Sequence, residues 1–157
     1  MLLGVQRRVN APVAVAAARA MSAAGEHAGA WLGLGALCAV VDGRRRPQWV
    51  RATGAVLAAH ATSVVLKRVV RRARPTHEGL RVHPGLAGRW GMPSSHAAST
   101  TAAAIAFAPL LGTRATFVVP PLMGLSRLVV GAHFPSDVLV GSALGAVTAL
   151  GLRRIRS

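Results

Sequence analysis

Residues 126–137 read Ser-Arg-Leu-Val-Val-Gly-Ala-His-Phe-Pro-Ser-Asp and join two apolar segments through a forced break. Because Pro135 cannot continue a helix, the stretch predicts that His133 ends one helix and that Asp137 lies in the first turn of the next. The carboxylate of Asp137 would then reach the imidazole of His133 and fix its tautomer, which leaves the other ring nitrogen free to attack an electrophile. Arg127 is suited to hold an anionic electrophile. The spacing therefore predicts a phosphate site.

Two upstream stretches complete a three-part pattern. Residues 67–75 read Lys-Arg-Val-Val-Arg-Arg-Ala-Arg-Pro, and residues 93–96 read Pro-Ser-Ser-His. Together the three stretches resemble the signature of the phosphatidic acid phosphatase type 2 superfamily: a lysine separated by six residues from Arg-Pro, then Pro-Ser-x-His, then Ser-Arg-x5-His-x3-Asp. The resemblance spans nearly half of the chain. Ser95 stands where that family most often has glycine, but a small residue there still lets the backbone approach a phosphate.

The composition predicts an all-α membrane protein. The 157 residues allow one domain, residues 1–157, in which hydrophobic residues make up 52% and only four residues are acidic. Abundant Ala and Gly favour closely packed membrane helices over the alternative, a soluble helical bundle. The net charge of +15 would suggest nucleic acid for a soluble protein. Since aromatic platforms and a continuous basic face are missing, we expect no nucleic-acid partner.

Five apolar runs predict a polytopic bundle of about five transmembrane helices. Each run is about 15 residues long, short of the roughly 20 needed to cross a bilayer. Helices beginning near residues 26, 50, 94 and 136 would gain several residues if their polar ends faced one another around the site. Residues 1–24 carry arginines on both sides of an apolar run, so an interfacial amphipathic helix is expected rather than a signal peptide. The apolar runs cover about residues 28–41, 52–66, 97–111, 115–130 and 138–152.

The basic segment before Arg-Pro predicts a phosphate-binding surface. If one helix continues to Pro75, Lys67, Arg71 and Arg74 recur at intervals of four and three and share one face. The alternative is that these side chains reach lipid headgroups from a helix end. The distance to Arg-Pro favours phosphate binding for Lys67 and Arg74. Arg68 and Arg72 fall on another face, where we expect them to reach headgroups.

Residues 94–96 open an alanine-rich helix. The free N–H groups of its first turn form an anion site, to which Ser94 and Ser95 can add hydroxyl donors. Ser94 could instead act only as an N-cap. A histidine at the start of a membrane helix is costly unless it is used, so His96 is expected to protonate the leaving oxygen and later to activate water. The resemblance implies that His133, oriented by Asp137, is the nucleophile and forms a phosphohistidine.

Glu26 and His27 precede the first long apolar run on the side of the predicted site. They either line the substrate entrance, with Arg71, or cap the helix, and we favour the cap. No His, Cys, Asp and Glu cluster in the sequence has metal-ligand spacing. The resemblance likewise implies neither a metal nor another cofactor.

The expected function is hydrolysis of a lipid-linked phosphomonoester by an integral membrane enzyme. Vanadium-dependent haloperoxidases share this pocket, but they are soluble and much longer. A degenerate, non-catalytic lipid-binding subunit is a further alternative, which the presence of both His133 and Asp137 disfavours. The short chain resembles small actinobacterial family members, which implies decaprenylphosphoryl-5-phosphoribose as substrate and decaprenylphosphoryl ribose, for cell-wall arabinan, as product. Undecaprenyl pyrophosphate, phosphatidylglycerophosphate and phosphatidic acid are alternative substrates.

The short basic turns predict the orientation in the cell membrane. Five spans after residue 25 would place Arg44, Arg114 and Arg153 on one side and all three motifs on the other. The positive-inside rule assigns the short basic turns to the cytoplasm, so the active site is expected on the extracytoplasmic face. The motif side also carries many cations, but phosphate binding accounts for several of them. The expected partners are the lipid-linked substrate and membrane lipids, and the oligomeric state is left open.

Overall fold

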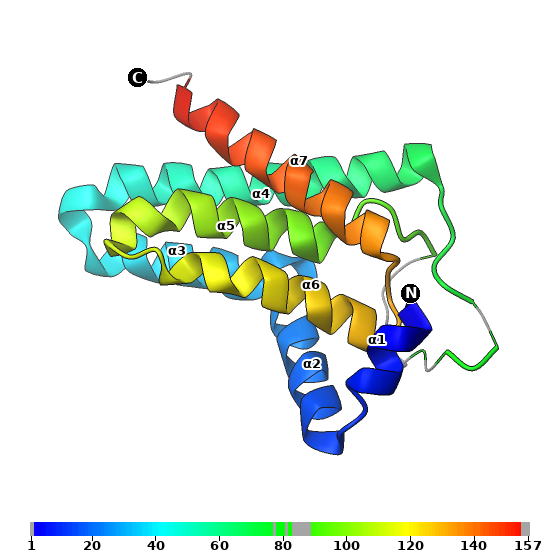
Figure 1. Cartoon of the computed structure of the whole chain (residues 1–157). Coiled ribbons are helices and arrows are strands. Elements are labelled where there is room, and N and C mark those ends of the chain that lie inside the picture. Colours follow the sequence, from blue (N-terminus) through cyan, green and yellow to red (C-terminus); the bar gives the residue numbers. More distant parts are fainter. Residues whose placement is uncertain (1, 77, 81, 83–88, 155–157) are drawn as a thin grey trace.

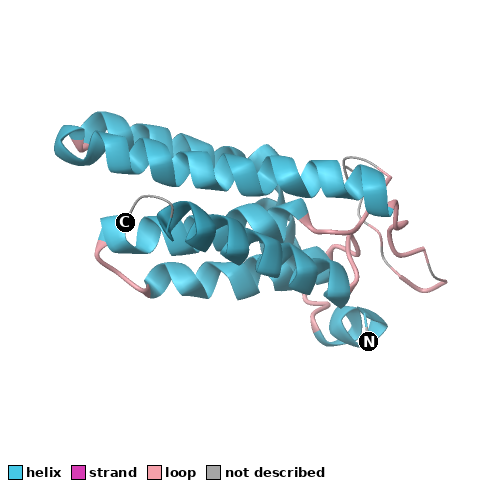
Figure 2. Ribbon diagram, turned by 90° about the horizontal axis from the view of Figure 1, so that it is seen from above, coloured by secondary structure: helices cyan, strands magenta, loops and turns pink. Residues whose placement is uncertain are grey.

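The computed structural model describes residues 2–76, 78–80, 82 and 89–154, whose regular elements are helices apart from one isolated bridge between Ala73 and Trp90 (Figures 1 and 2). The expectation of an all-α fold is therefore confirmed. Short 3₁₀ turns precede α3, α4 and α6; they are η1 (Glu26–Ala28), η2 (Gly43–Arg45) and η3 (Ala115–Val118). The helices are α1 (Leu2–Arg8), α2 (Pro12–Ala24), α3 (Gly29–Val41), α4 (Arg46–Val70), α5 (Ser95–Leu111), α6 (Val119–Val129) and α7 (Pro135–Arg154).

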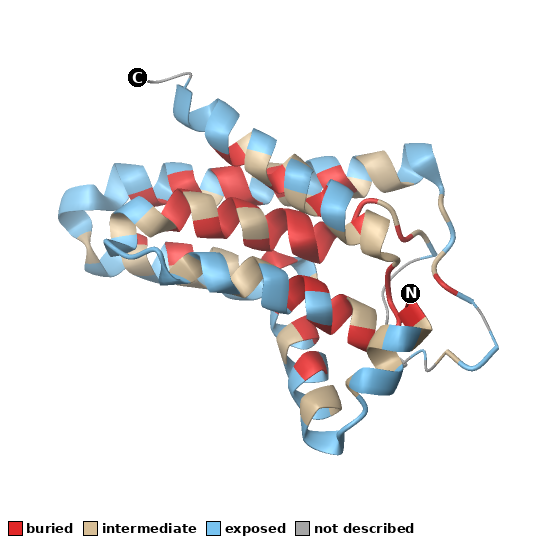
Figure 3. Cartoon of the chain, viewed as in Figure 1, coloured by how far each residue is buried: buried red, intermediate tan, exposed pale blue. Residues whose placement is uncertain are grey.

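Helix α5 is the centre of the bundle. It packs against α4, α6 and α7, while α3 packs mainly against α4 and also touches α5. Most residues of α5 are buried, as Figure 3 shows along its length. Its alanines let the neighbouring helices approach closely, as is typical of membrane helix packing. The larger side chain of Phe107 fills the space between Trp31 and Trp49, with ring centroids 6.5 and 5.5 Å away.

Two glycines bring α7 into direct backbone contact with α5. A Cβ atom at Gly141 would meet the carbonyl oxygen of Ser94, and one at Gly145 would meet that of Ala98. Asp137 lies one helical turn before Gly141. The close approach therefore joins the starts of the two helices, and the Ser94 N–H donates to the Asp137 carbonyl at 2.9 Å.

Two helices are long and apolar enough to cross a membrane, over Gly43–Val70 and Pro135–Arg154. A third span results if Pro12–Ala24 and Glu26–Val41, which are bent by 53° at their junction, are counted as one. By length and composition the described residues thus provide two or three candidate spans, fewer than the five apolar runs suggested. The difference arises because α5 and α6 are only 17 and 11 residues long.

The N-terminal segment differs from the single amphipathic helix expected over residues 1–24. Two helices form instead, because Pro12 opens α2 after a break that follows α1. Helix α2 packs on α6, and Ala18 and Ser22 are buried there. The bend at Gly25 then turns the chain into α3 and brings the end of α2 to the motif residues.

The motif residues and the short basic turns lie at opposite ends of the bundle (Figure 1). The α3–α4 and α5–α6 connections lie at the end where α7 finishes. The α4–α5 and α6–α7 connections, which carry the motifs, lie at the other. This separation agrees with the arrangement that the sequence predicts.

Candidate functional site

The His133–Asp137 pair is built by the start of α7. Helix α6 ends at Val129, so His133 lies in the connection to α7 and not at a helix end as expected. Asp137 is in the first turn of α7, and its Oδ2 accepts a hydrogen bond from the Phe134 N–H at 2.9 Å. This is half of a capping box, which fixes the carboxylate. The same Oδ2 lies 3.6 Å from Nδ1 of His133.

Burial keeps the His133 imidazole neutral. The side chain is 1% exposed, and burial lowers its pKa from 6.5 to about 4, although the Asp137 carboxylate acts in the opposite direction. Nδ1 is just beyond hydrogen-bond distance from Asp137 and has no other partner among the described residues. With Nδ1 facing the carboxylate, Nε2 is the nitrogen available to attack an electrophile.

Arg72 contacts Asp137, which corrects the expectation that it reaches lipid headgroups. Its Nη1 donates to Oδ1 of Asp137 at 3.1 Å and to Oγ of Ser136 at 2.7 Å. The guanidinium also lies 4.5 Å from the ring centroid of Phe134. The fully buried carboxylate is thus held between Arg72 on one oxygen and His133 on the other.

Helix α4 ends at Val70, whereas a shared face of Lys67, Arg71 and Arg74 would require the helix to continue to Arg74. Arg71 takes a left-handed conformation with φ 50° and turns the chain away from the helix axis. Its exposed side chain donates back to the Arg68 carbonyl, so the expectation that Arg71 continues the helical face of Lys67 is wrong. Arg71 is also not among the described residues that line the cavity. Arg68, in contrast, lines the cavity.

Lys67 and Arg74 tie the motif segments together. Lys67 Nζ lies 3.4 Å from the Trp90 carbonyl and 3.5 Å from that of Gly91, just before the Pro-Ser-Ser-His stretch. Arg74 Nη1 donates at 3.0 Å to the carbonyl of Ala132, directly before His133. Both side chains line the same cavity as His133.

Ser94 and Ser95, at the start of α5, have different environments. Ser94 is fully buried, and its Oγ accepts from the Ala97 N–H at 3.4 Å, so it acts as an N-cap. It is not among the residues that line the cavity, whereas Ser95 and His96 are. Only one of the two predicted hydroxyl donors therefore faces the site.

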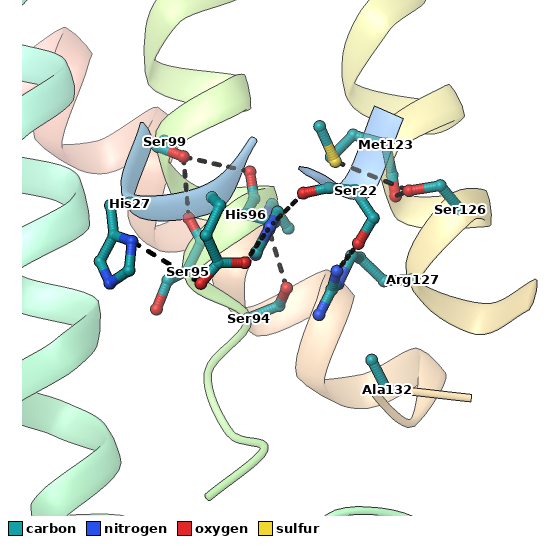
Figure 4. A network of polar contacts seen from close by, with 12 residues as sticks. Ser22, His27, Ser94, Ser95, His96, Ser99, Met123, Ser126, Arg127 and Ala132 are labelled. Atoms are coloured by element: carbon teal, nitrogen blue, oxygen red, sulfur yellow. Dashed lines mark hydrogen bonds and ion pairs between the residues drawn. The ribbon is translucent and has the colours of Figure 1, made fainter. Parts of the chain in front are cut away.

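Ser22 of α2 bridges two predicted site residues, as Figure 4 shows. Its carbonyl oxygen lies 2.9 Å from Nε2 of His96, and its hydroxyl accepts from Nη1 of Arg127. Arg127 is 2% exposed, and its Nε has no partner among the described residues. The sequence does not predict this contact of Ser22, because a serine in an alanine-rich helix carries no local signal of it.

Glu26 and His27 line the cavity and do not cap α3. The N-cap position of α3 is Ala28, so the preference for capping was wrong. His27 and Ala28 both have left-handed backbones, with φ of 50° and 59°. Oε2 of Glu26 lies 3.7 Å from Nε2 of His96, and Oε1 lies 3.8 Å from Nδ1 of His27.

The cavity holds about 240 Å³ and joins all three motifs. A groove of about 770 Å³ between α4, α5 and α7 is larger, but it lies at the other end of the bundle and contains no motif residue. Among the described residues, no group of three or more His, Cys, Asp or Glu side chains could hold a metal ion. The smaller cavity is lined by Glu26, His27, His60, Val64, Lys67, Arg68, Arg74, Arg89, Trp90, Ser95, His96, Arg127 and His133.

Comparison with known proteins agrees with the motif pattern. The family model described as the PAP2 superfamily matches residues 48–157. Decaprenylphosphoryl-5-phosphoribose phosphatase of Mycolicibacterium smegmatis is 42% identical over 90% of this chain and 79% of its own length. The protein of that name from Mycobacterium tuberculosis is 44% identical over 88% of this chain and 78% of its own length. A crystal structure of a transmembrane PAP2-type phosphatidylglycerolphosphate phosphatase from Bacillus subtilis has a TM-score of 0.79 at 19% identity, covering 98% of this chain and 83% of that one.

Proposed function

The chain belongs to the PAP2 superfamily, and from this premise we propose that it hydrolyses decaprenylphosphoryl-5-phosphoribose to decaprenylphosphoryl ribose and inorganic phosphate. The enzyme is a lipid phosphate phosphatase of this superfamily. The substrate follows from relatives of that name that are 42 and 44% identical over most of their length. The observation that carries the proposal is the convergence of the motif histidines His96 and His133 with several cations on one cavity.

The proposed reaction has two steps. Nε2 of His133 attacks phosphorus, an N–P bond forms, and the bond from phosphorus to the ribose oxygen breaks as His96 gives that oxygen its proton. Water then attacks phosphorus, the N–P bond to His133 breaks, the neutral His96 takes a proton from that water, and inorganic phosphate leaves. Lys67, Arg74 and Arg127 would balance the charge of the phosphoryl oxygens, with Ser95 as a further donor. Asp137 would keep His133 oriented through both steps.

We further propose that five segments lie in the membrane, with the site on the extracytoplasmic face. Helix α5 is enclosed by α4, α6 and α7, so protein covers much of its surface. The segment Ala115–Val129 is a shorter apolar helix. The short basic turns at the opposite end favour a cytoplasmic location for that end. A site outside the cytoplasm also suits a precursor of the cell wall.

Release of inorganic phosphate from four lipids tests the function. Purified protein in detergent should hydrolyse decaprenylphosphoryl-5-phosphoribose faster than undecaprenyl pyrophosphate, phosphatidylglycerophosphate or phosphatidic acid, with the same rate in excess chelator. His133→Ala should lose activity by orders of magnitude and form no covalent phosphoenzyme. Preference for another of the four lipids would overturn the substrate assignment. Dependence on added magnesium, or phosphoenzyme trapped in the His133 variant, would overturn the mechanism.

A further inference from the structure

One charged residue around the cavity does not suit the binding of phosphate. Lys67, Arg68, Arg74, Arg89 and Arg127 are basic, whereas Glu26 is the one carboxylate among the described lining residues. A carboxylate repels a bound phosphate and weakens its binding. The carboxylate of Glu26 is therefore expected to have a role whose benefit outweighs the weaker binding of phosphate.

Glu26 is brought to the cavity by an unusual turn. The chain leaves α2 at Gly25, where a Cβ atom would lie 2.7 Å from Cδ2 of His96, so only glycine lets the backbone approach this closely. The next turn has left-handed backbones at His27 and Ala28, which are rare for residues other than glycine. Such conformations cluster at functional sites because the surrounding structure must enforce them. The turn places the carboxylate against the edge of His96.

Both acceptors next to His96 lie on the side of its Nε2. The Ser22 carbonyl is 2.9 Å away and can only accept, so Nε2 carries the hydrogen. Oε2 of Glu26 is 3.7 Å from the same nitrogen. A carboxylate at this distance stabilises the imidazolium form.

Burial opposes a proton on the His96 ring, which is only 8% exposed, and so do the cations near it. The titratable rings nearby are His27, His60 and the neutral His133. Arg127 from α6 shares Ser22 with it, and Lys67 from α4 lines the same cavity. His27 belongs to the turn itself, and Arg74 and His133 come from the connecting segments. The carboxylate of Asp137 is absent from this lining and is engaged by Arg72 and His133. Glu26 is thus the group placed to offset the cations.

We propose that Glu26 is a positioning residue that keeps His96 protonated on Nε2 until the leaving oxygen takes that proton. The inference rests on the proposed phosphatase function. When the phosphorus–oxygen bond breaks, the Nε2–H bond breaks as well, the proton goes to the ribose oxygen, and the ring becomes neutral. It then takes a proton from the attacking water, and the pair with Glu26 is restored.

Glu26→Gln, compared on two substrates, tests this role. The variant keeps the shape and removes the charge, so turnover of the phosphoribosyl lipid should fall about 100-fold, as expected for loss of general acid help. An aryl phosphate with a leaving oxygen that needs no proton should be hydrolysed within about threefold of the wild-type rate. The basic limb of the kcat profile should move to lower pH. Glu78→Gln removes an exposed acid from the α4–α5 loop and serves as the matched control, with unchanged kinetics.

Other outcomes separate this inference from the proposed function. If wild-type protein hydrolyses the lipid and Glu26→Gln does so equally well, only the role of Glu26 is overturned. Equal losses on both substrates, with an unmoved pH profile, would show a structural contribution and overturn it too. A rise in KM confined to the phosphoribosyl lipid, with phosphatidic acid unaffected, would assign Glu26 to sugar recognition instead. If wild-type protein releases phosphate from none of the four lipids, the proposed function fails and this inference falls with it.

Discussion

At the scale of single residues, Asp137 holds together the parts of the site. One carboxylate oxygen accepts from the Phe134 N–H and faces His133, and the other accepts from Arg72. Its carbonyl accepts from Ser94, which starts the helix that carries His96. The proposed nucleophile, His133, and the proposed proton donor, His96, are therefore both linked to this one residue.

Arg72→Ala should lower kcat with little change in KM. Removing Arg72 leaves the buried carboxylate without its basic partner and lets it shift away from His133. Displacement of an orienting group by about 1 Å costs roughly 100-fold in rate, so we expect a loss of about 10- to 100-fold. Steady-state kinetics in detergent will measure it. Arg51→Ala, on the same helix at the opposite end, is the control, and equal effects of the two variants would refute the role of Arg72.

The His133 ring should titrate well below the usual range for histidine. Burial lowers its pKa from 6.5 to about 4, so the ring stays neutral as pH falls to about 5 and is protonated only near pH 4. NMR of imidazole-labelled protein should show one such resonance, absent from His133→Ala. Asp137 raises this pKa, and Asp137→Asn should therefore move the titration to still lower pH. A midpoint near 6.5 in the wild type would contradict the burial described here.

At the scale of elements, the contact between α5 and α7 sets the geometry of the site. The two helices start side by side at Ser94 and Asp137, and Gly141 and Gly145 allow their backbones to touch. A larger side chain on this face of α7 would push the first turn of α7 away from α5. Such a shift would change the positions of His133 and His96 relative to one another, although both residues are distant from Gly145 in the sequence.

Gly145→Ala should therefore destabilise the protein and lower its activity. The new methyl group would meet the Ala98 carbonyl, and overpacking of this kind costs about 1–3 kcal/mol. Thermal unfolding in detergent will report the loss. Gly151→Ala, on the same helix with open space around it, is the matched control and should be neutral or slightly stabilising. The same unfolding temperature for both variants would show that α7 can shift without cost.

At the scale of the whole molecule, the bundle separates two kinds of cation. The cavity end uses Lys67, Arg74 and Arg127 around the proposed phosphate site. The other end carries exposed arginines in short turns, where Arg45 pairs with Asp42 at 2.6 Å. Exposed arginines of that kind are typical of a cytoplasmic face.

Single cysteines should report the orientation in intact cells. In a Cys38→Ala background, an impermeant thiol reagent should label Glu78→Cys in the α4–α5 loop and spare Gly43→Cys in the α3–α4 turn. Both positions are exposed, so accessibility within the fold does not distinguish them. Labelling after membrane permeabilisation provides the control, and both cysteines should then react. The reverse pattern in intact cells would place the site in the cytoplasm.

The helical class, the family and the proximity of His133 and Asp137 can all be predicted from the sequence. These follow from short-range rules. Pro135 forces a break in the helix, three residues separate His133 from Asp137 across that break, and the motif spacing is read along the chain. The same rules failed for Arg71 and Arg72. The prediction assumed that the helix continues to Pro75, whereas the left-handed Arg71 ends α4 at Val70. As a result, Arg71 is exposed and Arg72 contacts Asp137.

The surroundings of His96, in contrast, depend on contacts between segments that are distant in the sequence. Ser22, Gly25 and Glu26 lie some 70 residues earlier in the chain, and they reach His96 because α2 packs on α6 and bends by 53° into the next segment. No local pattern encodes such a contact, since it depends on the packing of several helices at once. Spacing along the chain can identify the groups that react. The partners that fix their protons and orientation are decided by packing between distant segments.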